Sequence, residues 1–183
     1  MSYYLGIFGG VGTNPSAALL KGKKIIAFAE EERFNRIKNA PLALPLNAIF
    51  YCLKKAKISI NRIKEISFGW DCPHQFNIVP KKFKKIYLKH GGLRNRYNLN
   101  LEDRIRLGYD PDKIINEIKW AFAKKEQKFN KKIIYYKHHL SHAASTFYPS
   151  GFKKSSILIL DGMGEEFTGG FYVCYGKNIK WLI

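Results

Sequence analysis

Apolar and polar positions along the chain follow two periods, which predict an alternation of strands and helices. Short apolar or alternating runs bounded by glycine predict strands over residues 3–8, 16–20, 24–31, 65–70, 133–136, 156–161, 169–175 and 179–183. Apolar residues at 3.6-residue spacing predict helices over residues 45–56, 113–125 and 138–147. Pro45 suits the first turn of the first helix. The mixture of elements indicates the α/β class.

One order of elements occurs twice. A strand, a glycine-rich loop, a strand, a turn containing Gly-Lys and a third strand follow each other from residue 3, and again from residue 156. This duplication resembles the ribonuclease-H-like fold of actin, hexokinase and the Hsp70 ATPase. We expect a complete first module over residues 1–150, with a lysine-rich insertion over 73–111. Residues 151–183 then form the start of a second, incomplete module.

The expected second module has strands but no helix to cover them. A truncated reading frame, a split gene or an expressed fragment would each explain this arrangement. The expectation therefore includes a missing C-terminal region or a partner chain that completes the fold.

Composition adds constraints on the compartment and the partners. The 183 residues carry 32 basic and 14 acidic side chains, a formal charge of +18, with the densest stretch at Lys81 to Lys89. Such a surface can bind nucleic acid or attract anionic substrates, but solvated lysines on helix faces explain it equally simply. No apolar run approaches the roughly 20 residues of a membrane span. Three scattered cysteines and the absence of a signal-like N-terminus favour the cytoplasm.

The sharpest candidate chemistry lies in residues 137–150. His138 and His142 are one helical turn apart, so both imidazoles project from one face and can bind one divalent metal. Asp161 ends an apolar strand and is the candidate third ligand. Two nitrogens and one oxygen suit Fe²⁺, Mn²⁺ or Zn²⁺ with positions left open for substrate. The alternatives are an ordinary histidine pair and an ordinary Asp-Gly turn.

Two glycine-containing loops are candidate substrate or phosphate sites, because glycine lets backbone N–H groups approach anionic oxygens. The first contributes Gly12, Thr13 and Asn14, and the second contributes Gly162 and Gly164. The first loop has neither the lysine of a P-loop nor the spacing of a dinucleotide-binding fingerprint.

The acidic triplet Glu30, Glu31 and Glu32 precedes Arg33 and Arg36. Its charge pattern alone favours a salt-bridged surface, where each exposed pair contributes roughly 0–1 kcal/mol.

Taken together, these segments resemble the N-terminal domain of the nodulation and antibiotic-tailoring O-carbamoyltransferases. That domain typically carries a Ser-Ala-Ala-Leu run, a hairpin, a Glu-Glu-Glu-Arg-Phe segment, a His-His-x-x-His-Ala-Ala-Ser run, Tyr-Pro-Ser and Asp-Gly-x-Gly-Glu. The matching segments here are residues 16–19, 21–23, 30–34, 138–145, 148–150 and 161–165.

The resemblance implies an enzyme that uses ATP with Mg²⁺ and carbamoyl phosphate to form a carbamoyl-adenylate. The carbamoyl group then passes to a hydroxyl of a small molecule in biosynthesis. By position, His138, His142 and Asp161 inherit the metal-ligand role, and the carbamoyl-phosphate domain would lie C-terminal to this chain. The alternatives are a nucleic-acid-associated protein related to tRNA threonylcarbamoyl transferases and a catalytically silent subunit.

The chain departs from the family pattern at one position. The family has His-Asp before the Ser-Ala-Ala run, where this chain has Thr13-Asn14. Neither side chain acts as a base near neutral pH, so the catalytic base is unknown.

Overall fold

The computed structural model describes residues 1–78 and 108–182, and these form two compact units. Unit 1 comprises Met1–Phe68 and Cys72–Ile134, and unit 2 comprises Gly69–Asp71 and Tyr135–Ile183. The basic stretch predicted at Lys81 to Lys89 and most of the 73–111 insertion lie outside the described residues; of the insertion, residues 73–78 are helical.

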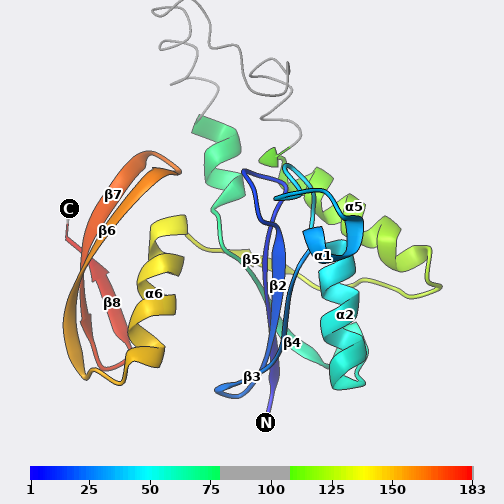
Figure 1. Cartoon of the computed structure of the whole chain (residues 1–183), viewed down its shortest axis with the longest axis horizontal. Coiled ribbons are helices and arrows are strands. Elements are labelled where there is room, and N and C mark those ends of the chain that lie inside the picture. The colour runs from blue at the N-terminus through cyan, green and yellow to red at the C-terminus, as the bar shows by residue number, and fades with distance from the viewer. Residues whose placement is uncertain (79–107, 183) are drawn as a thin grey trace, which may run out of the picture. The chain divides into compact units, whose positions relative to one another are not determined.

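Unit 1 is built on a mixed sheet whose strands follow the order β3-β2-β1-β4-β5 (Figure 1). β2 pairs antiparallel with both β1 and β3, whereas β1 and β4 are parallel. The strands are β1 (Tyr3–Phe8), β2 (Ser16–Lys21), β3 (Lys24–Glu30), β4 (Ile63–Phe68) and β5 (Ile133–Tyr135). This order and direction are those of the predicted ribonuclease-H-like fold.

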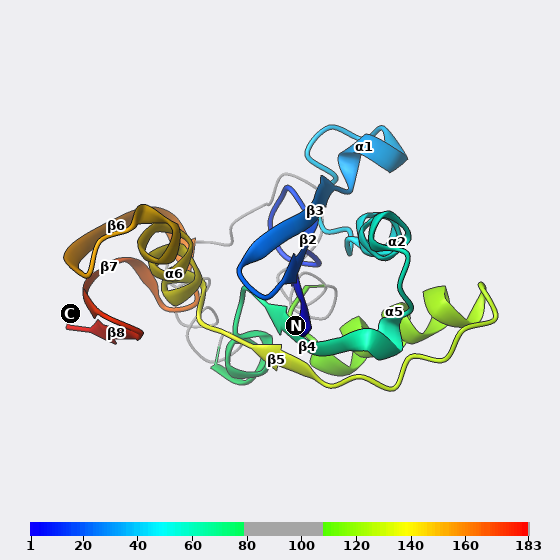
Figure 2. The same cartoon turned by 90° about the horizontal axis from the view of Figure 1, so that it is seen from below.

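Two long helices lie on the same side of this sheet in both cartoon views (Figures 1 and 2). They are α2 (Leu46–Ala56) and α5 (Pro111–Ala123), and their rings Phe50 and Phe122 lie 4.7 Å apart between centroids. Each helix presents an apolar face to the core, and the side chain of Asp110 caps α5 by accepting from two backbone N–H groups. The shorter helical turns are α1 (Glu32–Asn35) and η1 (Ile60–Arg62).

Unit 2 contains one helix and an antiparallel three-stranded sheet of order β6-β7-β8. The elements are α6 (His138–Ser150), β6 (Lys154–Gly164), β7 (Phe167–Tyr175) and β8 (Asn178–Trp181). Helix α6 covers one face of the sheet (Figure 2), where Ala143, Ile159 and Tyr172 form a small core. Alternate residues of β6, such as Leu158 and Leu160, are exposed.

The predicted elements are present, with differences at their ends. Strand β4 begins two residues earlier than predicted, at Ile63, and ends at Phe68. Helix α6 extends past Phe147 to Ser150 and includes Pro149, which has no N–H to donate to the helix. Strand β6 continues through Gly162 to Gly164 because its pairing with β7 resumes at Phe167 after an irregularity.

The division into modules at residue 150 stays a prediction. The compact units divide after Ile134, so α6 belongs to the same unit as β6, β7 and β8. Compactness and the start of a repeat are different properties, so this division does not locate the repeat boundary. None of the described helices is long and apolar enough to cross a membrane.

Candidate metal centre

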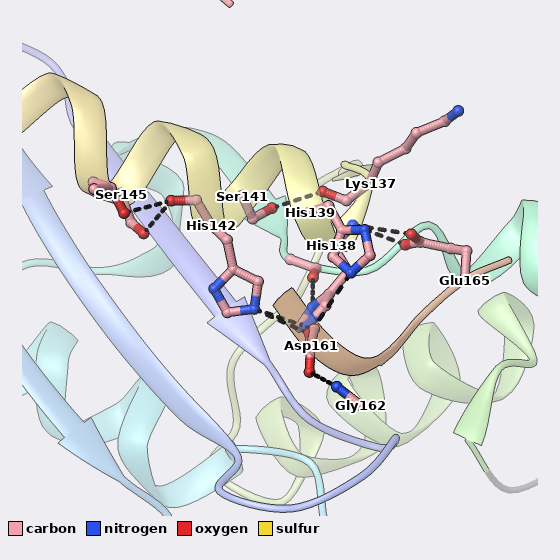
Figure 3. A network of polar contacts seen from close by, with 11 residues as sticks. Lys137, His138, His139, Ser141, His142, Ser145, Asp161, Gly162 and Glu165 are labelled. Carbon is pink, nitrogen blue, oxygen red and sulfur yellow. Dashed lines mark hydrogen bonds and ion pairs between the residues drawn. The ribbon is translucent and has the colours of Figure 1, made fainter. Parts of the chain in front are cut away.

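The two histidines of α6 and the aspartate of β6 converge within unit 2 (Figure 3). His138 Nε2 lies 2.9 Å from Asp161 Oδ2 and 2.9 Å from His142 Nε2, and His142 Nε2 lies 3.5 Å from Asp161 Oδ2. Ligands at about 2.0–2.2 Å from one cation lie roughly 3–3.5 Å from each other. These three donor atoms are therefore spaced as the ligands of a single ion would be.

The tautomer of His138 makes this cluster suited to a cation. Its Nδ1 lies 3.2 Å from the backbone oxygen of Gly69. A carbonyl can only accept, so Nδ1 carries the hydrogen and Nε2 of the neutral ring presents a lone pair. That lone pair faces the carboxylate of Asp161 at 2.9 Å, a contact between two acceptors. Only a second proton on His138 or a shared metal ion makes it favourable.

The pKa values of the other two side chains in the cluster are both lowered. Burial lowers the pKa of His142, and the positive charge that His138 carries when protonated lowers it further. Burial acts to raise the pKa of Asp161, but the hydrogen bond from Gly162 N and the charge of His138 outweigh it, so this pKa is lowered. His142 is thus neutral and Asp161 ionised near pH 7, which are the forms that bind metals.

His138 has two supports that the sequence did not reveal, Gly69 and Trp70. The ring of Trp70 packs against that of His138 at 4.6 Å between centroids, and Gly69 accepts from Nδ1. A backbone carbonyl has no sequence signature, and one tryptophan at the end of a predicted strand does not point to a site. These contacts fix the imidazole that lies nearest to Asp161.

His139, the neighbour of His138 in the sequence, also lies beside Asp161 in the structure. Its side chain is only 6% exposed, and Nε2 lies 3.8 Å from Asp161 Oδ2 with no hydrogen-bond partner among the described residues. Burial and the charge of His138 lower the pKa of His139. A cavity of about 150 Å³ opens beside it, lined among others by Lys137, Phe167, Tyr172 and Trp181.

The two glycines after Asp161 have different surroundings. Gly162 is exposed, and its N–H donates to Asp161 Oδ1 at 2.6 Å. Gly164 is buried, and a Cβ there would lie 2.6 Å from His139 Nε2, so only glycine leaves room for that ring. Both positions therefore have a role in the cluster itself, and their predicted role in phosphate binding stays a prediction.

The first glycine loop lies in unit 1. Gly12, Thr13 and Asn14 are exposed, and backbone bonds join Gly12 O to Leu42 N and Asn14 N to Asn39 O. Gly12 and Asn14 both have positive φ, near 60°, a region that favours these two residue types. The loop is thus held in a defined shape, and its role in substrate binding stays a prediction.

The acidic segment is only partly the predicted salt-bridged surface. Arg33 pairs with Glu30 at 3.0 Å and with Glu32 at 3.3 Å. Glu31 is buried instead, and its carboxylate accepts from the backbone N–H groups of Asn47 and Ala48. This carboxylate therefore caps the N-terminus of α2, where no local side chain does so.

The fold and the cluster define a ribonuclease-H-like protein with a candidate centre of two histidines and one carboxylate. A family model described as the carbamoyltransferase N-terminus matches residues 7–183, so the chain belongs to this family. The predicted family and fold class are both confirmed.

Two relatives and one solved structure illustrate the similarity. The nodulation protein NolNO of Sinorhizobium fredii is 30% identical over 169 residues, which cover 91% of this chain and 22% of the relative. An uncharacterized Synechocystis protein is also 30% identical over 169 residues, covering 90% of this chain and 26% of the relative. A crystal structure described as an uncharacterized protein similar to the peptidase YeaZ from Pseudomonas aeruginosa has a TM-score of 0.50. It is 14% identical and covers all of this chain and 64% of that one, which shows the fold alone.

Proposed function

We propose that this chain is the metal-binding N-terminal part of an O-carbamoyltransferase. The chain spans about a quarter of the length of the curated relatives it matches, so the complete reaction includes parts beyond it. In this proposal, carbamoyl phosphate and ATP give a carbamoyl-adenylate, whose carbamoyl group passes to a hydroxyl of a small molecule. In this proposal, the reaction takes place in the cytoplasm.

The observation that supports the proposal is the contact of His138 Nε2 with Asp161 Oδ2. Because Nδ1 already donates to Gly69, this pair is repulsive unless a positive charge lies between or on the two groups. His138, His142 and Asp161 would hold a divalent ion, Fe²⁺, Mn²⁺ or Zn²⁺. When bound, such an ion supplies Lewis acidity for substrate oxygens.

The residues of the chain contribute orientation and charge. Gly69 and Trp70 keep the ring of His138 in one orientation, so that its Nε2 is directed at the cluster. Gly162 N–H holds one oxygen of Asp161, which leaves the other oxygen directed at the histidines. The loop with Gly12, Thr13 and Asn14 would bind substrate or phosphate.

Metal analysis tests this proposal. After equilibrium dialysis against Mn²⁺, Zn²⁺ or, without oxygen, Fe²⁺, we expect about one ion per chain. His138→Ala combined with His142→Ala should abolish binding, because only one donor is left. His74→Ala, the same change at a histidine outside the cluster, is the matched control. Equal metal content in the double variant and the wild type would contradict the ligand assignment.

A catalytically silent subunit is the second candidate, and the observation that favours it is Thr13 at the family histidine position. In an assay that also supplies the carbamoyl-phosphate part that this proposal requires, Thr13→His combined with Asn14→Asp should raise carbamoyl transfer if the loop lacks only its base. A protein that is fully active with Thr13 in place would refute the silent role.

A further inference from the structure

Glu165, in the turn that joins β6 to β7, makes contacts that the metal cluster does not include. Its Oε1 accepts from the backbone N–H of His138 at 2.9 Å and from the backbone N–H of Asp71 at 2.9 Å. Its Oε2 lies 3.2 Å from the same N–H of His138. Figure 3 shows this carboxylate at the start of α6, on the opposite side of His138 from Asp161. One side chain therefore joins three segments that are distant in sequence.

These three segments are the ones that build the cluster. Helix α6 carries His138 and His142, strand β6 carries Asp161, and residues 69–71 supply the carbonyl that fixes the His138 tautomer. Glu165 itself follows Asp161 by four residues. A shift of this carboxylate would therefore change the position of His138 relative to both Gly69 and Asp161.

Helix α6 also lacks a cap of its own. The side chain of Lys137, at the N-cap, makes no capping hydrogen bond, and the first turn contains no acidic residue. The first N–H groups of a helix need partners, and a negative charge there is stabilised by the helix dipole. Glu165 supplies both for His138 N, so the start of α6 depends on a residue that lies 27 positions later in the chain.

We propose that Glu165 is a positioning residue, which sets the distance between the metal donors of α6 and Asp161. The inference rests on the proposed function, because the donors it positions are the proposed ligands. Glu165 acts through the backbone of His138 and binds no metal itself. The same device occurs in unit 1, where Glu31 caps α2 from a distant segment.

The identity of the accepting atom gives the proposal a sharp test. Oε1 accepts from both N–H groups, so a glutamine can keep these two bonds through its amide oxygen and lose only the longer bond from His138 N to Oε2. Alanine removes both bonds, and aspartate is one methylene too short to reach. The order of metal affinity should therefore be wild type, then Glu165→Gln within about threefold, then Glu165→Asp and Glu165→Ala about 10–100-fold weaker.

The experiment uses Co²⁺ as the probe, because its visible absorption reports the geometry of its ligands. Titration of the whole chain gives the affinity, and the spectrum should change in Glu165→Ala but not in Glu165→Gln. Glu117→Ala is the matched control, since Glu117 is a half-exposed glutamate of α5 in unit 1. A merely stabilising role would lower the melting temperature without changing the spectrum of the bound ion.

Each outcome decides one of the two proposals. Wild-type affinity and spectrum in Glu165→Ala would overturn the positioning role while leaving the metal site intact. If the wild type binds no Co²⁺, the proposed function fails, and the nitrogen-15 resonances of the His138 ring then decide the role of Glu165. Those resonances should change in Glu165→Ala and be retained in Glu165→Gln; unchanged resonances in both variants would overturn the inference.

Discussion

The two compact units keep their shape by different means. Unit 1 buries large apolar side chains completely, among them Leu5, Phe68 and Phe122, between its sheet and its helices. Unit 2 has a smaller buried cluster, formed by Ala143, Ile159 and Tyr172, yet it carries all three candidate metal donors. The candidate site is therefore held mainly by hydrogen bonds to defined partners, and bound metal would add to the stability of unit 2 in particular.

Truncation of a buried side chain should give the largest difference between the two units in the free energy of unfolding that is lost. Phe68→Ala removes a fully buried ring and should cost about 3–5 kcal/mol, with faster hydrogen exchange throughout β1 to β4. Ile159→Ala in unit 2 should cost about 2 kcal/mol, at the low end for such changes, because Ile159 is 8% exposed and belongs to a small buried cluster. Denaturant unfolding with hydrogen exchange measures both. If Ile159→Ala lost as much free energy of unfolding as Phe68→Ala, or more, the small core of unit 2 would contribute at least as much to stability as the core of unit 1.

Metal should stabilise unit 2 and leave unit 1 almost unchanged. At a free Mn²⁺ or Zn²⁺ concentration 100 times the dissociation constant, linkage adds about 2.7 kcal/mol to the folded form that binds it. Hydrogen exchange should slow in α6 and in β6 and return to its original rate after chelation. Protection that spreads equally through β1 to β4 would mean that the units do not unfold separately.

Loss of the Glu31 cap should destabilise unit 1 by about 1–3 kcal/mol, because Ala48 N–H is left buried without a partner. Glu31→Gln should recover part of this loss by accepting one of the bonds. Thermal melting measures the series, with Glu30→Ala, at a partly exposed glutamate, as control. A melting temperature unchanged in Glu31→Ala would refute the capping role.

The smallest effect concerns the buried thiol of Cys52. Burial raises the pKa of Cys52 to about 11, while the unfolded thiol ionises near its ordinary value. Between these values the unfolded state holds fewer protons than the folded state, so stability falls as the pH rises. We expect a loss of about 1–2 kcal/mol between pH 8 and pH 10.

The control for this experiment is Cys52→Ala, which should remove most of that slope. Native alkylation, mapped by mass spectrometry, adds a comparison between units. Cys174 in unit 2 should react faster than Cys52, because the smaller core opens more readily. Faster reaction at Cys52 would reverse the proposed order of stability.

The fold could be predicted because its determinants are local. The apolar spacing of residues 45–56 predicts α2 within one residue of its observed bounds, and the repeated strand order predicts the ribonuclease-H-like class. The ends of elements were less predictable, since β6 extends to Gly164 only through its pairing with β7. The period of apolar positions describes one helix or strand at a time, whereas the end of a strand depends on the strand that it pairs with.

The sequence by itself determined which three side chains are the candidate donors, because one helical turn separates His138 from His142 and Asp161 ends a strand. Only the tertiary structure decided how they are held. Glu165 accepts from the backbone N–H of His138, and the backbone carbonyl of Gly69 accepts from the His138 ring. A backbone N–H or carbonyl has the same chemistry at every residue. Such partners leave no pattern in a sequence, since folding alone brings them within hydrogen-bond distance.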